Sequence, residues 1–383
     1  MNGLQRSHLK TKGATMIPFL DLGAAYRELK PEIDDAVQRV LSSGWYILGP
    51  EVEAFEREWA AYCGSAHCVS VANGLDALEL ALKALGVGEG DEVIVPSNTY
   101  IATWLAVSAL GARPIPVEPN PNTHLVTADA IGQKITPRTR VILPVHLYGQ
   151  PADMGSIVEL AKSKSLYVVE DAAQAHGAKY QGKRIGSHGD IVCWSFYPGK
   201  NLGAYGDGGA VTTSNDELAD RIAVMRNYGS RQKYFNEVKG VNSRLDPLHA
   251  AVLRVKIPHL DGWNRRRAQI ANLYSTELKG LPLILPVTEM TSESAWHLYV
   301  IRTAQRSRLQ DALSKAGVGT LIHYPVPPHM QTAYRNLGFS ESSLPIARQL
   351  AKEVLSLPIG PHLSVDEAHA VCCIVRETVT DSS

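Results

Sequence analysis

The stretch between residues 68 and 213 alternates short apolar runs with amphipathic segments, and this alternation limits the fold more than any other feature of the chain. Strands are expected at 68–71, 92–96, 113–117, 140–146, 166–170, 190–196 and 210–213, and helices at 74–85, 101–110, 154–163 and 216–227. Strands that alternate with helices predict an α/β fold whose mostly parallel sheet is flanked by helices.

Two reactive residues fall at the ends of expected strands, where ligands of such sheets collect. Lys200 stands in a turn of glycine, proline and small polar residues just after the apolar run 191–194, and Asp171 ends the run 166–170. Burial favours a neutral lysine, and a neutral amine attacks carbonyl groups. A buried carboxylate and a lysine at neighbouring strand ends are what pyridoxal 5'-phosphate (PLP) requires.

Each residue alone also fits a plainer role. A lysine in a glycine-rich turn is usually a surface lysine. A strand that ends in Glu170-Asp171 often caps a helix or binds a metal.

Three further features suit a cofactor that carries a phosphate. Residues 71–78 run from a strand through Gly74 into a helix, whose free amides can bind a phosphate, although an ordinary strand-to-helix turn looks the same. Ser195 can donate to the phosphate, and Tyr100 can stack on a pyridine ring or pack in the core. The glycines of 203–209 do not link a strand to a helix, so they are not a dinucleotide fingerprint.

Composition excludes some classes of partner. Lys plus Arg equals Asp plus Glu, at 38 each, and there is no long apolar run, so neither nucleic acid nor a membrane is expected as a partner. The five cysteines lack a paired CxxC pattern and indicate reduced thiols in a cytoplasmic protein. We interpret Cys63, Cys68 and His67 as packing residues, and no metal site is expected.

A chain of 383 residues, 45% of them hydrophobic, is expected to form two domains. Residues 1–15 are polar and basic and indicate a disordered tail, a tag or an extended start. Residues 16–255 are expected to form a large PLP-binding domain. Residues 256–383 are expected to form a small α+β domain, with strands at 295–302 and 320–323 and helices at 307–316 and 345–354.

Three motifs, at 170–177, 195–203 and 206–210, closely resemble those of the PLP-dependent nucleotide-sugar aminotransferases of the DegT/StrS-like group. The resemblance runs from about Ile17 to near the C-terminus and includes 44–50 and 226–229, as well as 240–246. It implies PLP fold type I, which is aspartate aminotransferase-like and has a large domain and a small C-terminal domain.

The resemblance also implies roles for single residues. Lys200 would bind the cofactor aldehyde and later move the proton between the cofactor and the substrate carbon. Asp171 would pair with the pyridine nitrogen, Gln174 would lie near the phenolic oxygen, and Tyr100 would stack on the ring. Asn242 would reach the phosphate of the neighbouring subunit's cofactor, so a homodimer with shared active sites is implied. The phosphate would also be held by Gly74, Leu75 and Ser195.

Residues 146–154, 196–199 and 322–329 look most like those of members that act on dTDP-3-keto-6-deoxyhexoses. The implied reaction uses L-glutamate as the donor and yields a dTDP-3-amino-3,6-dideoxyhexose. Such sugars serve O-antigen or S-layer polysaccharides, other surface polysaccharides or glycosylated metabolites. Candidate substrate contacts are His323, His329, Tyr228 and Arg244, all of which also suit core, surface or interface positions.

Three alternatives remain open. In the first, the enzyme aminates another keto-sugar, either a 4-keto-6-deoxyhexose or a UDP-linked keto-sugar. In the second, the same fold carries out different PLP chemistry, such as dehydration or scyllo-inosose amination. In the third, the protein is a non-catalytic regulator. Related dehydratases carry histidine where this chain has Lys200, which favours transamination. A regulator has no use for the full set Asp171, Gln174, Ser195 and Lys200.

Overall fold

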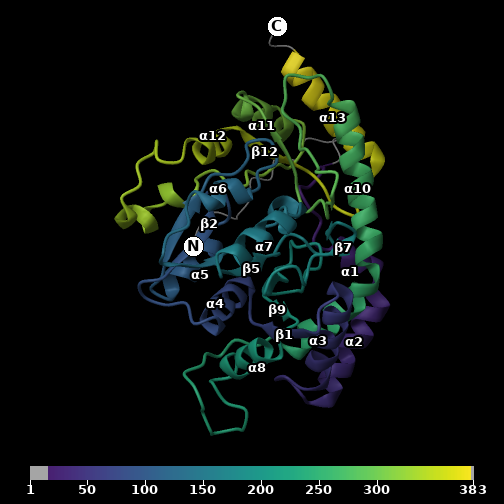
Figure 1. The fold of residues 1–383 in the computed structure, drawn as a ribbon. Helices are drawn as coiled ribbons and strands as arrows, with labels where there is room; N and C mark the ends of the chain where they lie inside the picture. Colours follow the sequence, from purple (N-terminus) through teal and green to yellow (C-terminus); the bar gives the residue numbers. More distant parts are fainter. Residues whose placement is uncertain (1–15, 381–383) are drawn as a thin grey trace.

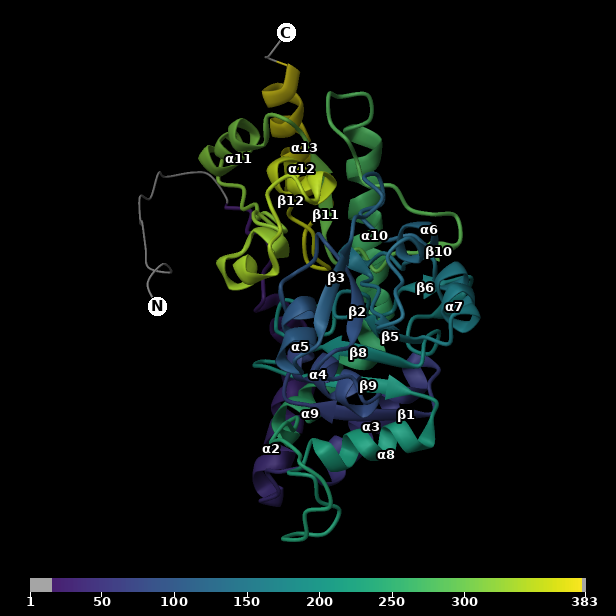
Figure 2. The ribbon, with the colours of Figure 1, turned by 60° about the vertical axis from the view of Figure 1, so that its left-hand side comes forward.

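The computed structural model describes residues 16–380, and a seven-stranded sheet lies at its centre (Figures 1 and 2). The residues expected to form a tail or tag, 1–15, lie outside the described part. The strands are β1 (His67–Val71), β2 (Glu92–Pro96), β3 (Arg113–Val117), β4 (Thr139–Ile142), β5 (Tyr167–Asp171), β8 (Ile191–Ser195) and β9 (Gly209–Thr213).

The strand order in this sheet is β1-β9-β8-β5-β4-β2-β3. The five strands from β8 to β3 pair in parallel, and β9 runs antiparallel to both β8 and β1. The expected mostly parallel sheet is confirmed. All five parallel strands therefore end at one edge, where the candidate residues are found.

Both faces of the sheet are covered, which explains why its strands have continuous apolar runs. In β8, Ile191 and Cys193 pack into one hydrophobic cluster, and Val192 and Trp194 pack into another. The first cluster lies under α4 (Gly74–Ala84), α5 (Ala102–Ala109) and α8 (Asp216–Met225). The second lies under α3 (Pro50–Cys63), α6 (Ala128–Gly132), α7 (Met154–Ser163) and α9 (Pro247–Lys256).

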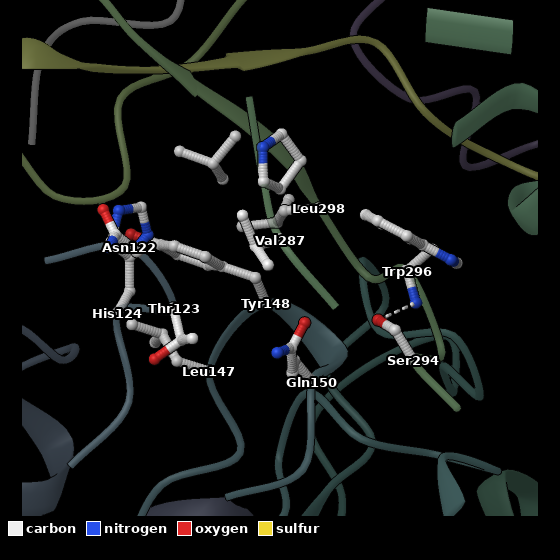
Figure 3. A pocket seen from close by; sticks show the side chains of 12 residues that line it. Asn122, Thr123, His124, Leu147, Tyr148, Gln150, Val287, Ser294, Trp296 and Leu298 are labelled. Carbon is white, nitrogen blue, oxygen red and sulfur yellow. Dashed lines mark hydrogen bonds between the residues drawn. The ribbon is translucent and has the colours of Figure 1, made fainter. Parts of the chain in front are cut away.

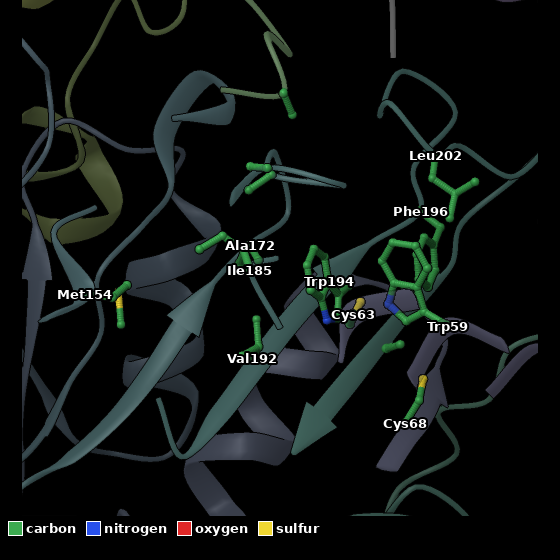
Figure 4. Close-up of a cluster of buried hydrophobic side chains, with 14 of the residues drawn as sticks. Trp59, Cys63, Cys68, Met154, Ala172, Ile185, Val192, Trp194, Phe196 and Leu202 are labelled. Carbon is green, nitrogen blue, oxygen red and sulfur yellow. The ribbon is translucent and has the colours of Figure 1, made fainter. Parts of the chain in front are cut away.

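Three aromatic side chains, Trp59, Trp194 and Phe196, lie together in the second cluster (Figure 4). Trp59 of α3 is fully buried, and its ring lies 5.1 Å from Trp194 and 5.6 Å from Phe196, both edge-on. Edge-to-face pairs at this spacing add to the stabilisation that burial gives. Helix α3 is thereby fixed against the strand that leads to Lys200.

The C-terminal part packs around a small antiparallel sheet of β11 (Tyr299–Arg302) and β12 (Val354–Leu357). A separate hydrophobic cluster joins this sheet to α10 and α13, and Ile17 from the start of the described chain packs into it. The expected boundary between 255 and 256 stays a prediction. The helices here are α10 (Leu260–Glu277), α11 (Arg306–Lys315), α12 (Pro345–Glu353) and α13 (Val365–Thr380).

The remaining elements are short or peripheral. Helix α2 packs against α9, through Ile33 and Val252 among others. These elements are α1 (Ala24–Glu28), α2 (Lys30–Ser43), β6 (Lys179–Tyr180), β7 (Lys183–Arg184), β10 (Ser292–Glu293), and the 3₁₀ turns η1 (Leu147–Gly149), η2 (Ile257–His259), η3 (Pro328–Met330) and η4 (Thr332–Leu337). Within residues 16–380, no helix combines the length and the apolar character needed to cross a membrane.

Three expected strands are wrong in extent. The run 140–146 forms a strand only as far as Ile142, because the chain then turns into η1, where Tyr148 has φ 62°. The run 295–302 forms a strand only from Tyr299 to Arg302, because Trp296 has φ 46° and interrupts the extended backbone. The run 320–323 makes a single bridge, between Leu321 and Ser356, instead of a strand. These segments border the candidate site, where loops take the place of regular structure.

The aromatic cluster gives a stability prediction. Trp59→Ala removes a fully buried indole and should lower the free energy of unfolding by about 3–5 kcal/mol. Chemical denaturation of the purified protein measures this loss. Met290→Ala, at a fully exposed side chain, is the control and should change the stability little. Equal stabilities of the two variants would contradict the packing described.

Candidate active site

Asp171 and Lys200 come together because β5 and β8 are parallel neighbours. Asp171, the last residue of β5, pairs with Cys193 of β8, and Lys200 follows β8 in a turn in which its amide donates to the carbonyl of Tyr197 at 2.8 Å. Strands that point the same way end at the same edge of a sheet. A carboxylate and an amine that are far apart in sequence therefore share one edge.

Residues on both sides of Lys200 in its turn are buried in the core. Phe196, Leu202 and Ala204 are buried in the same cluster as Trp59, and Figure 4 shows Leu202 beside Phe196. At Gly203 the chain passes so close to Pro198 that a Cβ atom would fall 2.4 Å from its carbonyl oxygen. Only glycine fits there, and the turn is consequently a fixed structure.

Asp171 is buried and makes two hydrogen bonds. Its Oδ2 accepts from the hydroxyl of Thr103 at 3.0 Å, and its Oδ1 accepts from the amide of Ala173 at 3.2 Å. Burial raises the pKa of Asp171, while Ala173, Thr103 and the charge of Lys200 act in the opposite direction. The burial effect dominates, so this carboxylate would gain from a cation beside it.

Lys200 shows the complementary effect. Burial lowers the pKa of its amine to about 8, and the negative charge of Asp171 opposes that change. A lysine in water titrates about two units higher. Near neutral pH, a usable fraction of Lys200 is thus the neutral amine that can attack an aldehyde.

The start of α4 lies against Ser195 and forms a cradle for an anion. A Cβ atom on Gly74 would fall 2.6 Å from the Cβ of Ser195, so glycine is needed for this approach. The side chain of Asn73 accepts from the amide of Asp76, and no hydrogen bond within residues 16–380 uses the amides of Gly74 and Leu75. Free amides at a helix start suit a phosphate. Together with the lysine and the carboxylate, this cradle fits PLP.

Gln174 and Tyr324 form a second side of the site. The Gln174 Oε1 accepts from the amide of Tyr148 at 2.6 Å, and its Nε2 donates to the hydroxyl of Tyr324 at 3.0 Å. The ring of Tyr324 lies 5.5 Å from that of Tyr100, which is 58% exposed. Tyr324 lies 150 residues from Gln174, within the run 322–329 that resembles sugar-specific members, but it had not itself been predicted as a site residue.

A buried pair of side chains, His146 and Glu170, lies at the end of β5. The amide of Ala152 donates to Nδ1 of His146, so Nε2 carries the hydrogen and donates to Oε2 of Glu170 at 2.8 Å. Both side chains are fully buried. Among the described residues, no group of three or more His, Cys, Asp or Glu side chains is placed to hold a metal ion.

The two histidines proposed as substrate contacts differ. His323 makes a hydrogen bond through Nδ1 with the hydroxyl of Ser356, and burial and then the charge of Lys200 lower its pKa to about 4. It therefore lies within electrostatic reach of Lys200. His329 is buried in η3, and within the described part of the chain no hydrogen bond or ring contact joins it to the residues above.

The remaining candidates lie on the loop after α8, which extends from the end of the molecule near α2 (Figures 1 and 2). Arg244 donates to Asn227 at 2.9 Å and lies over the ring of Tyr228, and Asn242 is exposed. The buried Ser243 was missed in the sequence: its hydroxyl accepts from the amide of Ala72, and it fastens the loop beside the start of α4. The structure thus places Tyr228, Asn242 and Arg244 on one loop, which is a different segment from that of His323.

A pocket that is open to solvent adjoins the site (Figure 3). Tyr148, which contacts Gln174, forms one wall, and Trp296 forms another. The side-chain nitrogens Nε2 of His124 and Gln150 are buried in its lining and have no hydrogen-bond partner among residues 16–380.

Comparison with known proteins agrees with this geometry. Residues 27–376 match the model of the DegT/DnrJ/EryC1/StrS aminotransferase family. A solved structure, S. venezuelae DesV in complex with a ketimine intermediate, superposes with a TM-score of 0.93 at 56% identity, covering 94% of this chain and 98% of that one.

Three curated relatives share more than half of their residues with this chain. The erythromycin biosynthesis sensory transduction protein EryC1 of Saccharopolyspora erythraea is 58% identical and covers 94% of this chain and 99% of its own. The dTDP-3-amino-3,4,6-trideoxy-alpha-D-glucose transaminase of Streptomyces venezuelae is 57% identical, and the match covers 94% of this chain and 96% of the relative. The dTDP-3-amino-3,6-dideoxy-alpha-D-galactopyranose transaminase of Aneurinibacillus thermoaerophilus is 54% identical, and the match covers 93% of this chain and 98% of the relative.

Fold and site define a PLP-dependent aminotransferase of fold type I. The chain belongs to the DegT/DnrJ/EryC1/StrS aminotransferase family.

The low pKa of Lys200 predicts a pH dependence. Only the neutral amine attacks an aldehyde, so the rate at which the protein without cofactor binds added PLP should rise with pH to a plateau, with a midpoint of about 8. Asp171→Asn removes the charge that raises this pKa and should move the midpoint lower. Stopped-flow absorbance measures both. A midpoint near that of free lysine would refute the desolvation of Lys200.

Proposed function

We propose that this protein transfers the amino group of L-glutamate to C3 of a dTDP-3-keto-6-deoxyhexose and produces a dTDP-3-amino-3,6-dideoxyhexose. One observation carries the proposal: the two named transaminases above, at 57% and 54% identity, are both named for dTDP sugars with the amino group at position 3. Their sugars differ at C4, one being 4-deoxy and the other galacto-configured. The configuration at C4 of the proposed product is accordingly left open.

The residues of the site would divide the work as follows. Bound PLP supplies an aldehyde and an electron-withdrawing ring. Lys200 Nζ would bind that aldehyde, and once displaced by the substrate amine it would carry a proton between the substrate carbon and the cofactor. Asp171 keeps the ring nitrogen protonated, and Gln174 and Tyr100 orient the ring. The phosphate would be held by Gly74, Leu75 and Ser195, with Asn242 as a fourth contact. The sugar nucleotide would be contacted by His323, His329, Tyr228 and Arg244.

We further propose a homodimer in which Asn242 of one subunit serves the cofactor of the other. The support is a set of exposed apolar side chains, of a kind that marks protein interfaces. Trp45 and Tyr46 follow α2 and are 57% and 51% exposed, and Tyr234 and Phe235 on the loop after α8 are 83% and 65% exposed. Both segments belong to the end of the molecule that carries α2 and α8 (Figure 2).

The proposed compartment is the cytoplasm, and the proposed product enters a surface polysaccharide, such as O-antigen or S-layer glycan, or a glycosylated metabolite. Support for the compartment comes from the free thiols, which are typical of a reducing environment. They are Cys63, Cys68, Cys193, Cys372 and Cys373.

A regulatory function is the second candidate, since the 58% identical relative is named a sensory transduction protein. A regulator that only keeps the fold would not need a desolvated lysine beside a buried carboxylate. The geometry around Asp171 and Lys200 therefore favours catalysis.

Both half-reactions can be followed in the visible spectrum of the PLP-loaded protein. Glutamate should bleach the absorbance that depends on Lys200, and a dTDP-3-keto-6-deoxyhexose should restore it. The 4-keto isomer and a UDP-linked 3-keto-sugar are the comparison substrates. If the absorbance returns only with the 4-keto isomer, the proposed position of amination is wrong. If neither glutamate nor another amino donor changes the absorbance, the regulatory function is favoured.

Mixing two inactive variants tests the shared site. Lys200→Ala lacks the amine and Asn242→Ala lacks the proposed phosphate contact. If Asn242 acts on the other subunit, each mixed dimer has one intact site, and refolded mixtures should recover about a quarter of the wild-type activity. If Asn242 acts within its own subunit, both sites of a mixed dimer are defective, and mixing recovers nothing.

A further inference from the structure

Ser243 makes hydrogen bonds to both ends of the segment that forms the proposed phosphate cradle. Its Oγ accepts from the amide of Ala72 at 3.0 Å and donates to Oδ2 of Asp76, in the first turn of α4, at 2.5 Å. The side chain is fully buried. One hydroxyl therefore joins two residues that lie on either side of the free amides of Gly74 and Leu75.

The partners of Ser243 determine which way its hydrogen points. A backbone amide only donates and a carboxylate only accepts, so the single hydroxyl hydrogen goes to Asp76. The backbone amide of Ser243 donates to the carbonyl of Arg226 at 2.9 Å, and Arg226 Nη1 donates to the carbonyl of Ser70 in β1 at 2.6 Å. The hydroxyl is thus held at a fixed position relative to both β1 and α4.

The carboxylate of Asp76 is a competitor for the cradle from within the chain. Asn73 is the N-cap of α4, and Asp76 is the third residue of the helix. An acidic residue at this position commonly reaches back to the amide of the N-cap residue, and a negative charge is stabilised near a helix start. The amide of Asn73 makes no hydrogen bond within residues 16–380, so it is open to either anion. In this structure the carboxylate bonds to Ser243 instead.

We propose that Ser243 is a positioning residue for the phosphate cradle. Its hydroxyl holds the Asp76 carboxylate away from the amides of residues 73–75 and leaves these amides for the phosphate. Without that hydroxyl, the carboxylate would accept from the Asn73 amide, and its charge would repel the phosphate. The inference rests on the proposed phosphate site and is independent of which sugar is the substrate.

The test compares the binding of PLP with that of pyridoxal, which lacks the phosphate, to the full-length protein without cofactor. Absorbance titrations give both dissociation constants, and their ratio isolates the contribution of the phosphate. Ser243→Ala frees the Asp76 carboxylate and should weaken PLP binding by about tenfold, while the affinity for pyridoxal stays the same. Asp76→Ala in the same chain removes the competitor, so the double variant should return to within about twofold of the wild-type ratio.

Ser230→Ala is the matched control, because this serine lies on the same loop and its hydroxyl donates to the carbonyl of Asn227 at 3.0 Å. It should change neither dissociation constant, and thermal unfolding checks that each variant folds. A wild-type ratio in a folded Ser243→Ala variant would overturn the proposal, and so would a loss of the same size in Ser230→Ala. A double variant as weak as Ser243→Ala alone would also overturn it, because the loss would then come from a loosened loop and not from Asp76.

If Ser243→Ala does not fold, Asp76→Ala alone decides. Ser243 already holds the carboxylate in the wild-type protein, so this variant should keep the ratio within about twofold of the wild-type value. A change of about tenfold in either direction would overturn the proposal, since the carboxylate would then compete with the phosphate, or help to bind it, despite Ser243. A wild-type protein that binds PLP no more tightly than pyridoxal would instead refute the phosphate site itself. None of these measurements depends on turnover of a sugar, so they are distinguishable from a failure of the proposed substrate.

Discussion

The parallel pairing of β5 with β8 is the constraint on which the site depends. It brings the end of one strand, Asp171, to the same edge as the turn that follows the other. The core then holds that turn through Phe196 and Leu202. A shift of β5 by one residue would turn Asp171 to the opposite face of the sheet and remove it from Lys200. The hydrophobic alternation of β5 and β8 between two clusters therefore specifies the register and the chemistry together.

Burial acts on the two charged groups in opposite directions, and its effect exceeds their mutual attraction. The pKa of Lys200 falls to about 8 although Asp171 lies near, and that of Asp171 rises although Lys200 lies near. The pair is thus poised for a partner from outside the chain. A cationic ring nitrogen satisfies the buried carboxylate, and an aldehyde consumes the neutral amine. The amides of Gly74 and Leu75 at the start of α4, which make no hydrogen bond within residues 16–380, complete the match by supplying an anion site.

Local pattern predicted much of this from the sequence, and long-range contacts account for what it could not predict. The strand ends, the helix start at Gly74 and the turn at Lys200 all have signals within a few residues, and the structure places them as expected. Tyr324 and Ser243 reach the site from segments more than 40 residues away from Lys200 in the sequence, and no periodicity marks them. The segment 320–323 has the composition of a strand, but only Leu321 pairs, because its neighbours turn toward Tyr148 and Ser356 instead.

The most direct test of the central claim is the protonation state of the ring nitrogen of bound PLP, read from its ¹⁵N chemical shift. The account predicts a protonated nitrogen in the wild-type protein throughout neutral pH, because a buried carboxylate faces it. In Asp171→Asn the nitrogen should lose its proton. The same shift in both proteins would contradict the account, since Asp171 would then have no part in holding the ring.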